Sequence, residues 1–194
     1  MTDEDLNGRL EFLRHAEQLK DTLRSAHTAQ GRVESVAEHT WRLALFVMTF
    51  CDQLPELDHL KLMKLCVLHD LGEAIGGDIP APLQTADNDK RDQERADFLF
   101  LLKPLPEPAR SEFIALWDEY DLGESPEARV AKAFDKLETI LQHTQGANPV
   151  DFDYEFNLGY GKAYTDQVPL AVAIREVLDG VTRQRAQEQS KSCK

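Results

Sequence analysis

Apolar residues recur with the period of an α-helix along nearly the whole chain, and no alternating β-strand pattern of any length stands out. At 194 residues the chain is long enough to bury a core without disulfides or a structural metal. We therefore expect one all-α domain over residues 1–194, a bundle of about six or seven helices. Helices are predicted at 4–20, 35–52, 58–75, 89–102, 107–121, 126–144 and 166–188, and the polar tail from about residue 185 is expected to be flexible.

Local signals support several of these boundaries. Ser35 and Glu38 form a capping box just before an apolar run, which is typical of a helix start. Pro80 and Pro82 are expected to keep the loop after the third predicted helix extended. The stretch 146–161 is rich in aromatic residues but lacks a helical pattern, so we expect an ordered loop or cover there.

Composition limits the possible partners. The formal net charge of −13 argues against binding to a nucleic acid polymer or an anionic membrane, because both need a basic surface. No signal peptide is recognised, and no apolar run approaches the length of a membrane span. Two of the three cysteines, Cys51 and Cys66, lie in apolar helical contexts and are interpreted as reduced core thiols. A cytoplasmic protein is the resulting expectation.

The adjacent pair His69 and Asp70 lies in the predicted helix 58–75. That helix is apolar nearly all round, through Leu60, Leu62, Met63, Leu65, Cys66, Val67 and Leu68. Such a helix is expected to be buried, and an ionised carboxylate in the interior is costly unless a cation or hydrogen bonds compensate it. A metal ion shared with His69 is the simplest compensation.

Two other predicted helices supply further candidate ligands. His39 lies on an apolar stripe with Val36, Leu43, Phe46, Val47 and Phe50. Asp135 lies at the border of the apolar face of the helix predicted over 126–144. Two imidazoles and two carboxylates suit a divalent transition metal such as Mn, Co, Fe or Zn, with positions left open for water and substrate.

Two further acids accompany the His69–Asp70 pair. Glu73 falls one helical turn beyond it, and Asp78 lies in the loop after Gly76 and Gly77. Carboxylates beside a metal-bound water suit a general base and a general acid. The spacing lacks the second histidine of the zinc protease pattern, and the two glycines follow a helix rather than a strand, which excludes a phosphate-binding loop.

Taken singly, each residue has a simpler interpretation. An inward histidine is more often a hydrogen-bonded core residue than a ligand, and Asp135 can pair with Lys132 or Lys136 on its own helix. Glu138 and Asp151 also lie near candidate positions but receive no role. The combination on three helices, rather than any one residue, favours a metal site.

Four stretches resemble a known family. They are LKDTLR (19–24), ESVAEHTWRLAL (34–45), LHDLGEAIGGDIP (68–80) and AFDKLETILQ (133–142). Together they cover roughly residues 10 to 142. In their order and spacing they are similar to the HD-domain metal-dependent phosphohydrolases. The similarity is to the branch of small bacterial 5'-deoxynucleotidases and their eukaryotic HD-domain-containing relatives.

The resemblance implies a role for each matching residue. The four implied ligands of a single divalent metal are His39, His69, Asp70 and Asp135. Glu73 and Asp78 resemble the acids that assist the attacking water and protonate the departing nucleoside oxygen. The resemblance also implies a helical HD-domain fold and a homo-oligomer, most often a dimer.

Phosphate binding is implied for Arg24, with Arg32 as a second candidate if the loop is offset. Some nucleotidases of this branch carry an aromatic residue after the arginine, which is associated with a preference for 2'-deoxy sugars. Here that residue is Ser25, so the resemblance does not carry deoxy selectivity over.

Three functions follow from these residues. The first is hydrolysis of nucleoside 5'-monophosphates by a metal-activated water. The second is hydrolysis of another phosphoester, such as a modified nucleotide, a pyrophosphate or a cyclic nucleotide. The third is a nucleotide-binding regulator without catalysis, which is disfavoured because a degenerate site is expected to lose the ligands and acids that this chain retains.

Overall fold

The structure, a computed structural model, describes residues 1–79 and 88–192 and confirms an all-α fold. The loop with Pro80 and Pro82 lies outside the described residues. Within them, seven helices have ten or more residues, in agreement with the predicted six or seven: α1 (Asp3–Ala16), α2 (Val36–Phe50), α3 (His59–Leu68), α5 (Asn88–Leu101), α6 (Glu107–Leu122), α7 (Pro126–Gln145) and α10 (Pro169–Ser192). No helix in this part of the chain is long and apolar enough to cross a membrane.

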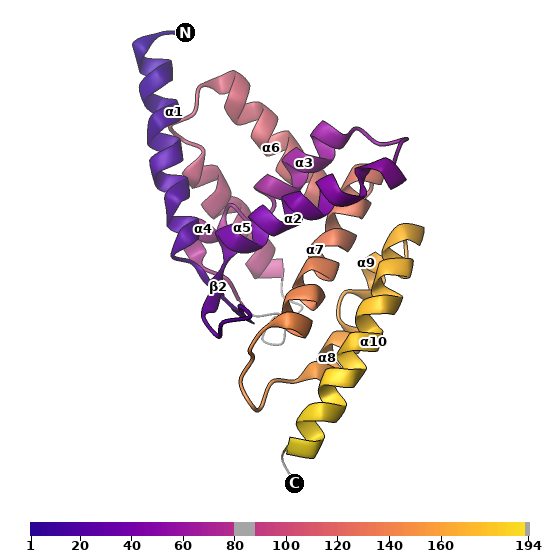
Figure 1. The fold of residues 1–194 in the computed structure, drawn as a ribbon. Helices are drawn as coiled ribbons and strands as arrows, with labels where there is room; N and C mark the ends of the chain where they lie inside the picture. The colour runs from indigo at the N-terminus through magenta and orange to yellow at the C-terminus, as the bar shows by residue number, and fades with distance from the viewer. Residues whose placement is uncertain (80–87, 193–194) are drawn as a thin grey trace.

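Helix α7 runs through the middle of the molecule. It packs against α2, α3 and α6 on one side and against α10 on the other (Figure 1). Ser125 caps its start by accepting a hydrogen bond from the backbone N–H of Ala128 (3.1 Å), and Pro126 occupies the first turn, where proline is favoured. Phe134 and Leu137 are fully buried at its centre. Residues of α7 can therefore reach most other elements of the fold.

The N-terminal part contains a β-hairpin that the sequence analysis did not predict. Strand β1 (Leu23–His27) pairs antiparallel with β2 (Val33–Ser35), with Leu23 opposite Ser35. Gly31, with a φ of 83°, supplies the left-handed conformation in the connection. The strands are too short to produce a visible alternation in the sequence. The predicted capping box is confirmed, because Ser35 and Glu38 exchange hydrogen bonds at the start of α2.

The helix predicted over 58–75 is interrupted at the His69–Asp70 pair. Helix α3 ends at Leu68, and the short α4 (Glu73–Gly76) follows a turn. The backbone carbonyl of His69 accepts a hydrogen bond from Trp117 Nε1 (3.2 Å). The backbone N–H of Glu73 donates instead to the backbone carbonyl of Asp70 (3.0 Å). The tryptophan therefore takes the carbonyl that a continuing helix would use.

The expectation that this helix is buried all round is also wrong. Leu60 and Val67 are 66% and 45% exposed, whereas Leu62, Leu65 and Cys66 are fully buried. One face of α3 thus packs on the core, and its C-terminal end carries Asp70 to the edge of a pocket rather than into a closed interior.

The C-terminal part is more helical than predicted. The stretch 146–161, expected to be a loop or cover, includes α8 (Tyr154–Gly159), and α9 (Lys162–Thr165) follows it. Helix α10 continues to Ser192 instead of ending near residue 188. Arg185 and Gln189 of this last part donate hydrogen bonds to the carbonyls of Gly146 (2.7 Å) and Val150 (2.6 Å), which join α10 to the loop.

Gly72 lies where the turn after α3 approaches α5 closely. A Cβ atom at this position would lie 2.8 Å from the backbone carbonyl oxygen of Glu94. We expect Gly72→Ala to lower the free energy of unfolding by about 1–3 kcal/mol, because backbone atoms must move apart. Gly180→Ala is the control, since nothing lies within 4 Å of its Cβ position in α10. Urea unfolding of both variants tests this, and equal stabilities would contradict it.

Candidate metal centre

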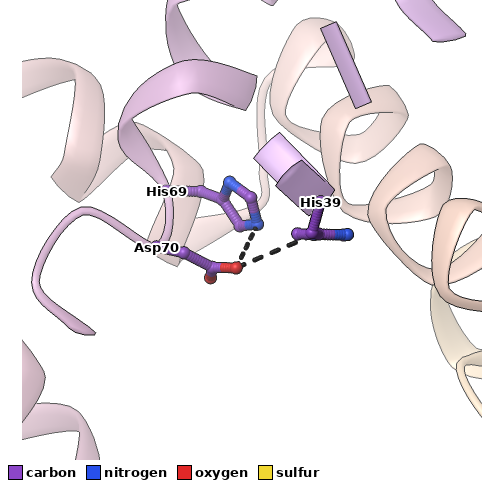
Figure 2. Close-up of side chains that lie close together, drawn as sticks. All are labelled: His39, His69 and Asp70. Atoms are coloured by element: carbon purple, nitrogen blue, oxygen red, sulfur yellow. Dashed lines mark ion pairs between the residues drawn. The ribbon is translucent and has the colours of Figure 1, made fainter. Parts of the chain in front are cut away.

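Three side chains from two helix regions converge at the middle of the molecule. His39 comes from the first turns of α2, and His69 and Asp70 from the end of α3 (Figure 2). One ligand atom of each lies within 4.8 Å of the others. Asp70 Oδ2 is 2.9 Å from His69 Nε2 and 3.7 Å from His39 Nε2. The group has the size and atom types of a metal-binding site.

The orientation of both imidazole rings is fixed through Nδ1. His39 Nδ1 forms a short contact with a carboxylate oxygen of Glu138, and His69 Nδ1 donates to the carbonyl of Cys66 (2.8 Å). Both Nε2 atoms are buried and lie close to carboxylate oxygens, His69 Nε2 2.9 Å from Asp70 Oδ2 and His39 Nε2 3.2 Å from Asp135 Oδ1, but neither makes a hydrogen bond of good geometry within the described residues. Buried nitrogens without a well-aligned hydrogen bond are rare, and metal-binding histidines typically use one nitrogen for a hydrogen bond and the other for the metal. The two Nε2 atoms therefore fit a metal ion.

Asp135 joins this group from α7. Its Oδ1 lies 3.2 Å from His39 Nε2 and 3.8 Å from His69 Nε2. Its Oδ2 is 2.8 Å from Lys136 Nζ and accepts a hydrogen bond from the Tyr120 hydroxyl (3.1 Å). The pairing with Lys136 is therefore real, but it occupies one oxygen and leaves the other facing the two histidines. The structure thus brings all four predicted ligands together.

Glu138 is a site residue to which the sequence analysis gave no role. It is fully buried on α7 and contacts His39 through one oxygen, while Arg42 Nε donates to the other (2.5 Å). Its spacing, one helical turn after Asp135, is a signal in the sequence that places it on the same face. A carboxylate behind a metal-binding histidine orients the ring and increases its basicity.

The charges of this group are strongly coupled. Burial favours a higher pKa for Asp70, but the charge of His69 and its contact with the carboxylate lower the pKa to about 2. Burial and Arg24 act against a charged His39, yet the carboxylates around it, Glu138 first, raise its pKa to about 9. In the metal-free protein a proton on His39 therefore balances part of the negative charge, which is the role that a cation would take.

A pocket of about 520 Å³ is lined by three of the four residues, His69, Asp70 and Asp135, whereas His39 is buried behind them. Arg24, Glu73 and Asp78, the other predicted site residues, all line it, as does Ser25. Arg32 does not. Its guanidinium pairs with Glu38 near the surface, with 3.0 Å between Nη1 and Oε2. The structure thus distinguishes the two phosphate-binding candidates and places only Arg24 at the pocket.

Arg24 is held by neighbours on three sides. It lies on β1, and its Nη2 donates to the Thr139 hydroxyl (3.0 Å). Nε lies 3.5 Å from Glu34 Oε2, and Nη1 lies 3.7 Å from Asp70 Oδ2. Burial acts against the charge, but the carboxylates around it, Asp70 first, raise the pKa of Arg24 above its usual value. A fixed guanidinium beside a metal-ligand carboxylate is suited to binding a phosphate.

Glu73 is buried at the start of α4. Burial, together with the charges of Asp70 and Asp78, raises its pKa to about 10. In the metal-free protein Glu73 thus carries a proton at neutral pH. A divalent cation bound nearby would lower this pKa, because it favours the charged carboxylate.

A further part of the pocket lining was not predicted. It consists of aromatic residues from the loop before α8, from α8 itself and from the residue after it, namely Phe152, Phe156 and Tyr160, and of Lys132 and Lys136 from α7. The aromatic run in 146–161 was visible in the sequence, but only the packing of α8 against α10 and of α9 against α7 brings it to the site. Aromatic rings there offer a flat surface on which a planar group such as a base could stack.

The arrangement combines a cation site, a fixed guanidinium, buried acids and an aromatic wall in one pocket. This combination suits hydrolysis of a phosphoester, in which positioning and charge stabilisation dominate the catalysis.

Comparisons with known proteins agree with this interpretation. Residues 16–175 match the HD domain family. Human 5'-deoxynucleotidase HDDC2 is 33% identical over 138 residues, which cover 70% of this chain and 67% of that protein. The Danio rerio 5'-deoxynucleotidase HDDC2 is 31% identical over 139 residues, covering 71% of this chain and 68% of that protein.

A solved structure also has the same fold. A Magnetospirillum magnetotacticum protein named "Predicted metal-dependent phosphohydrolase" superposes with a TM-score of 0.75 at 24% identity, over 93% of this chain and 97% of that one. The family match spans the segment from the hairpin to α7, and this segment contains Arg24 and the six residues singled out from the motifs. The chain belongs to the HD-domain family.

Proposed function

We propose that this protein is a metal-dependent phosphomonoesterase that hydrolyses nucleoside 5'-monophosphates to a nucleoside and phosphate. The observation that carries the proposal is the pair of buried Nε2 atoms, on His39 and His69, which have no hydrogen bond among the described residues and face two carboxylates. The relatives named 5'-deoxynucleotidase support the same substrate class.

The proposed ligands are His39, His69, Asp70 and Asp135, the last through Oδ1. When bound, a divalent transition metal would lower the pKa of a coordinated water and attract a phosphate oxygen. Glu138 holds His39 in the orientation that this requires, and Lys136 with Tyr120 holds the other oxygen of Asp135. The choice among Mn, Co, Fe and Zn follows availability as much as the ligand set.

Arg24 would hold the phosphate, while Glu73 and Asp78 would serve as the acid and base pair. The oxygen of water attacks phosphorus, and the bond from phosphorus to the nucleoside 5'-oxygen breaks. One of the two acids accepts the proton of the water, and the other protonates the departing oxygen. Phe152, Phe156 and Tyr160 would contact the base.

We also propose that residues 1–194 form one domain, that the protein works in the cytoplasm, and that it forms a homodimer. The free thiols of Cys51 and Cys66 and the net charge of −13 support the compartment. Exposed apolar side chains on one stripe of α2, Trp41, Leu45 and Met48, support self-association.

Removal of Asp70 tests the metal mechanism. We expect Asp70→Ala to lose both the bound metal and phosphate release from nucleoside 5'-monophosphates with Mn, Co or Mg added. Metal content and released phosphate are measured in parallel for the variant, the wild type and Asp52→Ala, an exposed control. Full phosphatase activity in a metal-free Asp70→Ala protein would rule the mechanism out.

Arg24 is expected to act on the phosphate. Arg24→Ala should lower kcat/KM for a nucleoside monophosphate by about a hundredfold, because a fixed charge-assisted donor is lost. Arg32→Ala is the matched control, since its guanidinium pairs with Glu38 away from the pocket and kcat/KM should stay close to wild type. Equal losses in both variants would contradict the assignment.

Metal binding should depend on pH through His39. Its pKa in the metal-free protein is raised from 6.5 to about 9, so the ion must displace a proton below that pH. Affinity for Mn²⁺ should therefore rise by about tenfold per pH unit up to pH 9 and then level off, with proton release on binding. Asp70, with a pKa of about 2, does not titrate in this range.

Calorimetry in buffers of different ionisation enthalpy measures both the affinity and the released protons. Glu138→Gln removes the carboxylate that raises the pKa of His39, so its affinity should level off at a lower pH. A constant affinity between pH 6.5 and 9 in the wild type would contradict the prediction.

A further inference from the structure

One face of α7 carries a stripe of basic residues, of which the proposed hydrolysis uses only Lys136, to hold Asp135. Arg129, Lys132 and Lys136 lie at i, i+3 and i+7 and therefore project to the same side of the helix. Lys132 and Lys136 line the main pocket, and Lys132 also lines a second hollow of about 210 Å³ together with Arg129. The stripe is basic although the chain has a net charge of −13, and Lys136 lies at the end of the stripe beside the metal centre.

The two lysines differ in their partners. Lys136 Nζ is 2.8 Å from Asp135 Oδ2 and is thereby tied to the metal centre. Lys132 forms no ion pair within the described part of the chain. Its Nζ lies 4.4 Å from the ring centre of Tyr120 and 5.5 Å from that of Tyr164. Two aromatic faces thus position a cation that has no carboxylate at contact distance.

One acidic residue that lines the pocket together with this lysine already has a partner. Asp121 lines both hollows, but its carboxylate forms a close ion pair with Arg91 of α5. Burial and the charge of Lys136 both lower the pKa of Lys132, which means that both disfavour its positive charge. An anion bound beside the two ammonium groups would stabilise the charged form of Lys132.

We propose that Lys132 and Lys136 form a second anion subsite, which fits a nucleotide carrying a second phosphate besides the one that is cleaved. This inference rests on the proposed function. The reacting phosphate would lie at the metal centre with Arg24, which adjoins Asp70, and the second phosphate would lie along α7 on the side of Asp135. The second phosphate can belong to a 3',5'-bisphosphate, in which water displaces the 5'-oxygen and a nucleoside 3'-phosphate leaves. It can also belong to a 5'-diphosphate, in which water attacks the terminal phosphorus and the nucleoside 5'-monophosphate leaves.

The test compares kcat/KM for a nucleoside 5'-monophosphate, the 5'-diphosphate and the 3',5'-bisphosphate of the same nucleoside. We expect at least one doubly phosphorylated nucleotide to exceed the monophosphate by about tenfold or more. Lys132→Met, which keeps the aliphatic stem, should lower that ratio at least about tenfold, and Lys132→Arg should restore much of it. The better of the two substrates identifies the source of the second phosphate.

Lys103→Met is the matched control. Lys103 Nζ also lies 4.4 Å from an aromatic ring centre, that of Phe100, but at an exposed site away from the pocket, so the ratio should not change. When phosphate is released, the inference is overturned if the wild type shows no preference for either doubly phosphorylated nucleotide, or if Lys132→Met keeps the wild-type ratio.

A binding measurement separates this inference from the proposed function. Calorimetry on metal-depleted protein gives the dissociation constants of the same three nucleotides without turnover. If no phosphate is released from any nucleotide but a doubly phosphorylated one binds about tenfold more tightly in a Lys132-dependent way, the proposed function fails and the subsite stands. Equal dissociation constants overturn the subsite whether or not the enzyme is active.

Discussion

The orientation of two buried imidazole rings is the constraint on which the rest of the site depends. Glu138 and the carbonyl of Cys66 each hold one ring nitrogen, so the two remaining Nε2 atoms face a common point without hydrogen-bond partners among the described residues. Helix α7 provides both Glu138 behind His39 and Asp135 in front of it. The packing of α7 against α2 and α3 therefore sets the distances of the whole centre.

The pocket has two chemically different sides. On one side, the hairpin and the turn after α3 present Arg24 and the buried acid Glu73 to the place where a phosphate would react. On the other side, α7 and the segment around α8 present lysines and aromatic rings. Residues from the hairpin, from the turn after α3, from α7 and from the segment around α8 thus line the same pocket, although they lie far apart in the sequence.

Helical periodicity and capping signals were sufficient to predict the long helices, because both act within a few residues. They did not predict the β-hairpin, whose strands are short, or the break after Leu68, where the side chain of Trp117 takes a backbone carbonyl from a distant part of the chain. The residues proposed as ligands were found from their positions on apolar helix faces. Glu138 received no role because its spacing from Asp135 shows that it shares a helix face but not that its carboxylate contacts His39, which only the packing of α7 against α2 decides.

The sequence by itself determined that the chain is helical, that histidine and aspartate occur on three apolar helix faces, and that the motifs resemble those of HD-domain proteins. The tertiary structure decided which atoms meet. It turned Asp135 Oδ1 toward the histidines, placed Arg24 at the pocket and Arg32 outside it, and left Lys132 between two aromatic rings. A local sequence pattern indicates which face of its own helix or strand a residue occupies. Contacts between residues that are distant in the chain depend instead on how the helices and strands pack together.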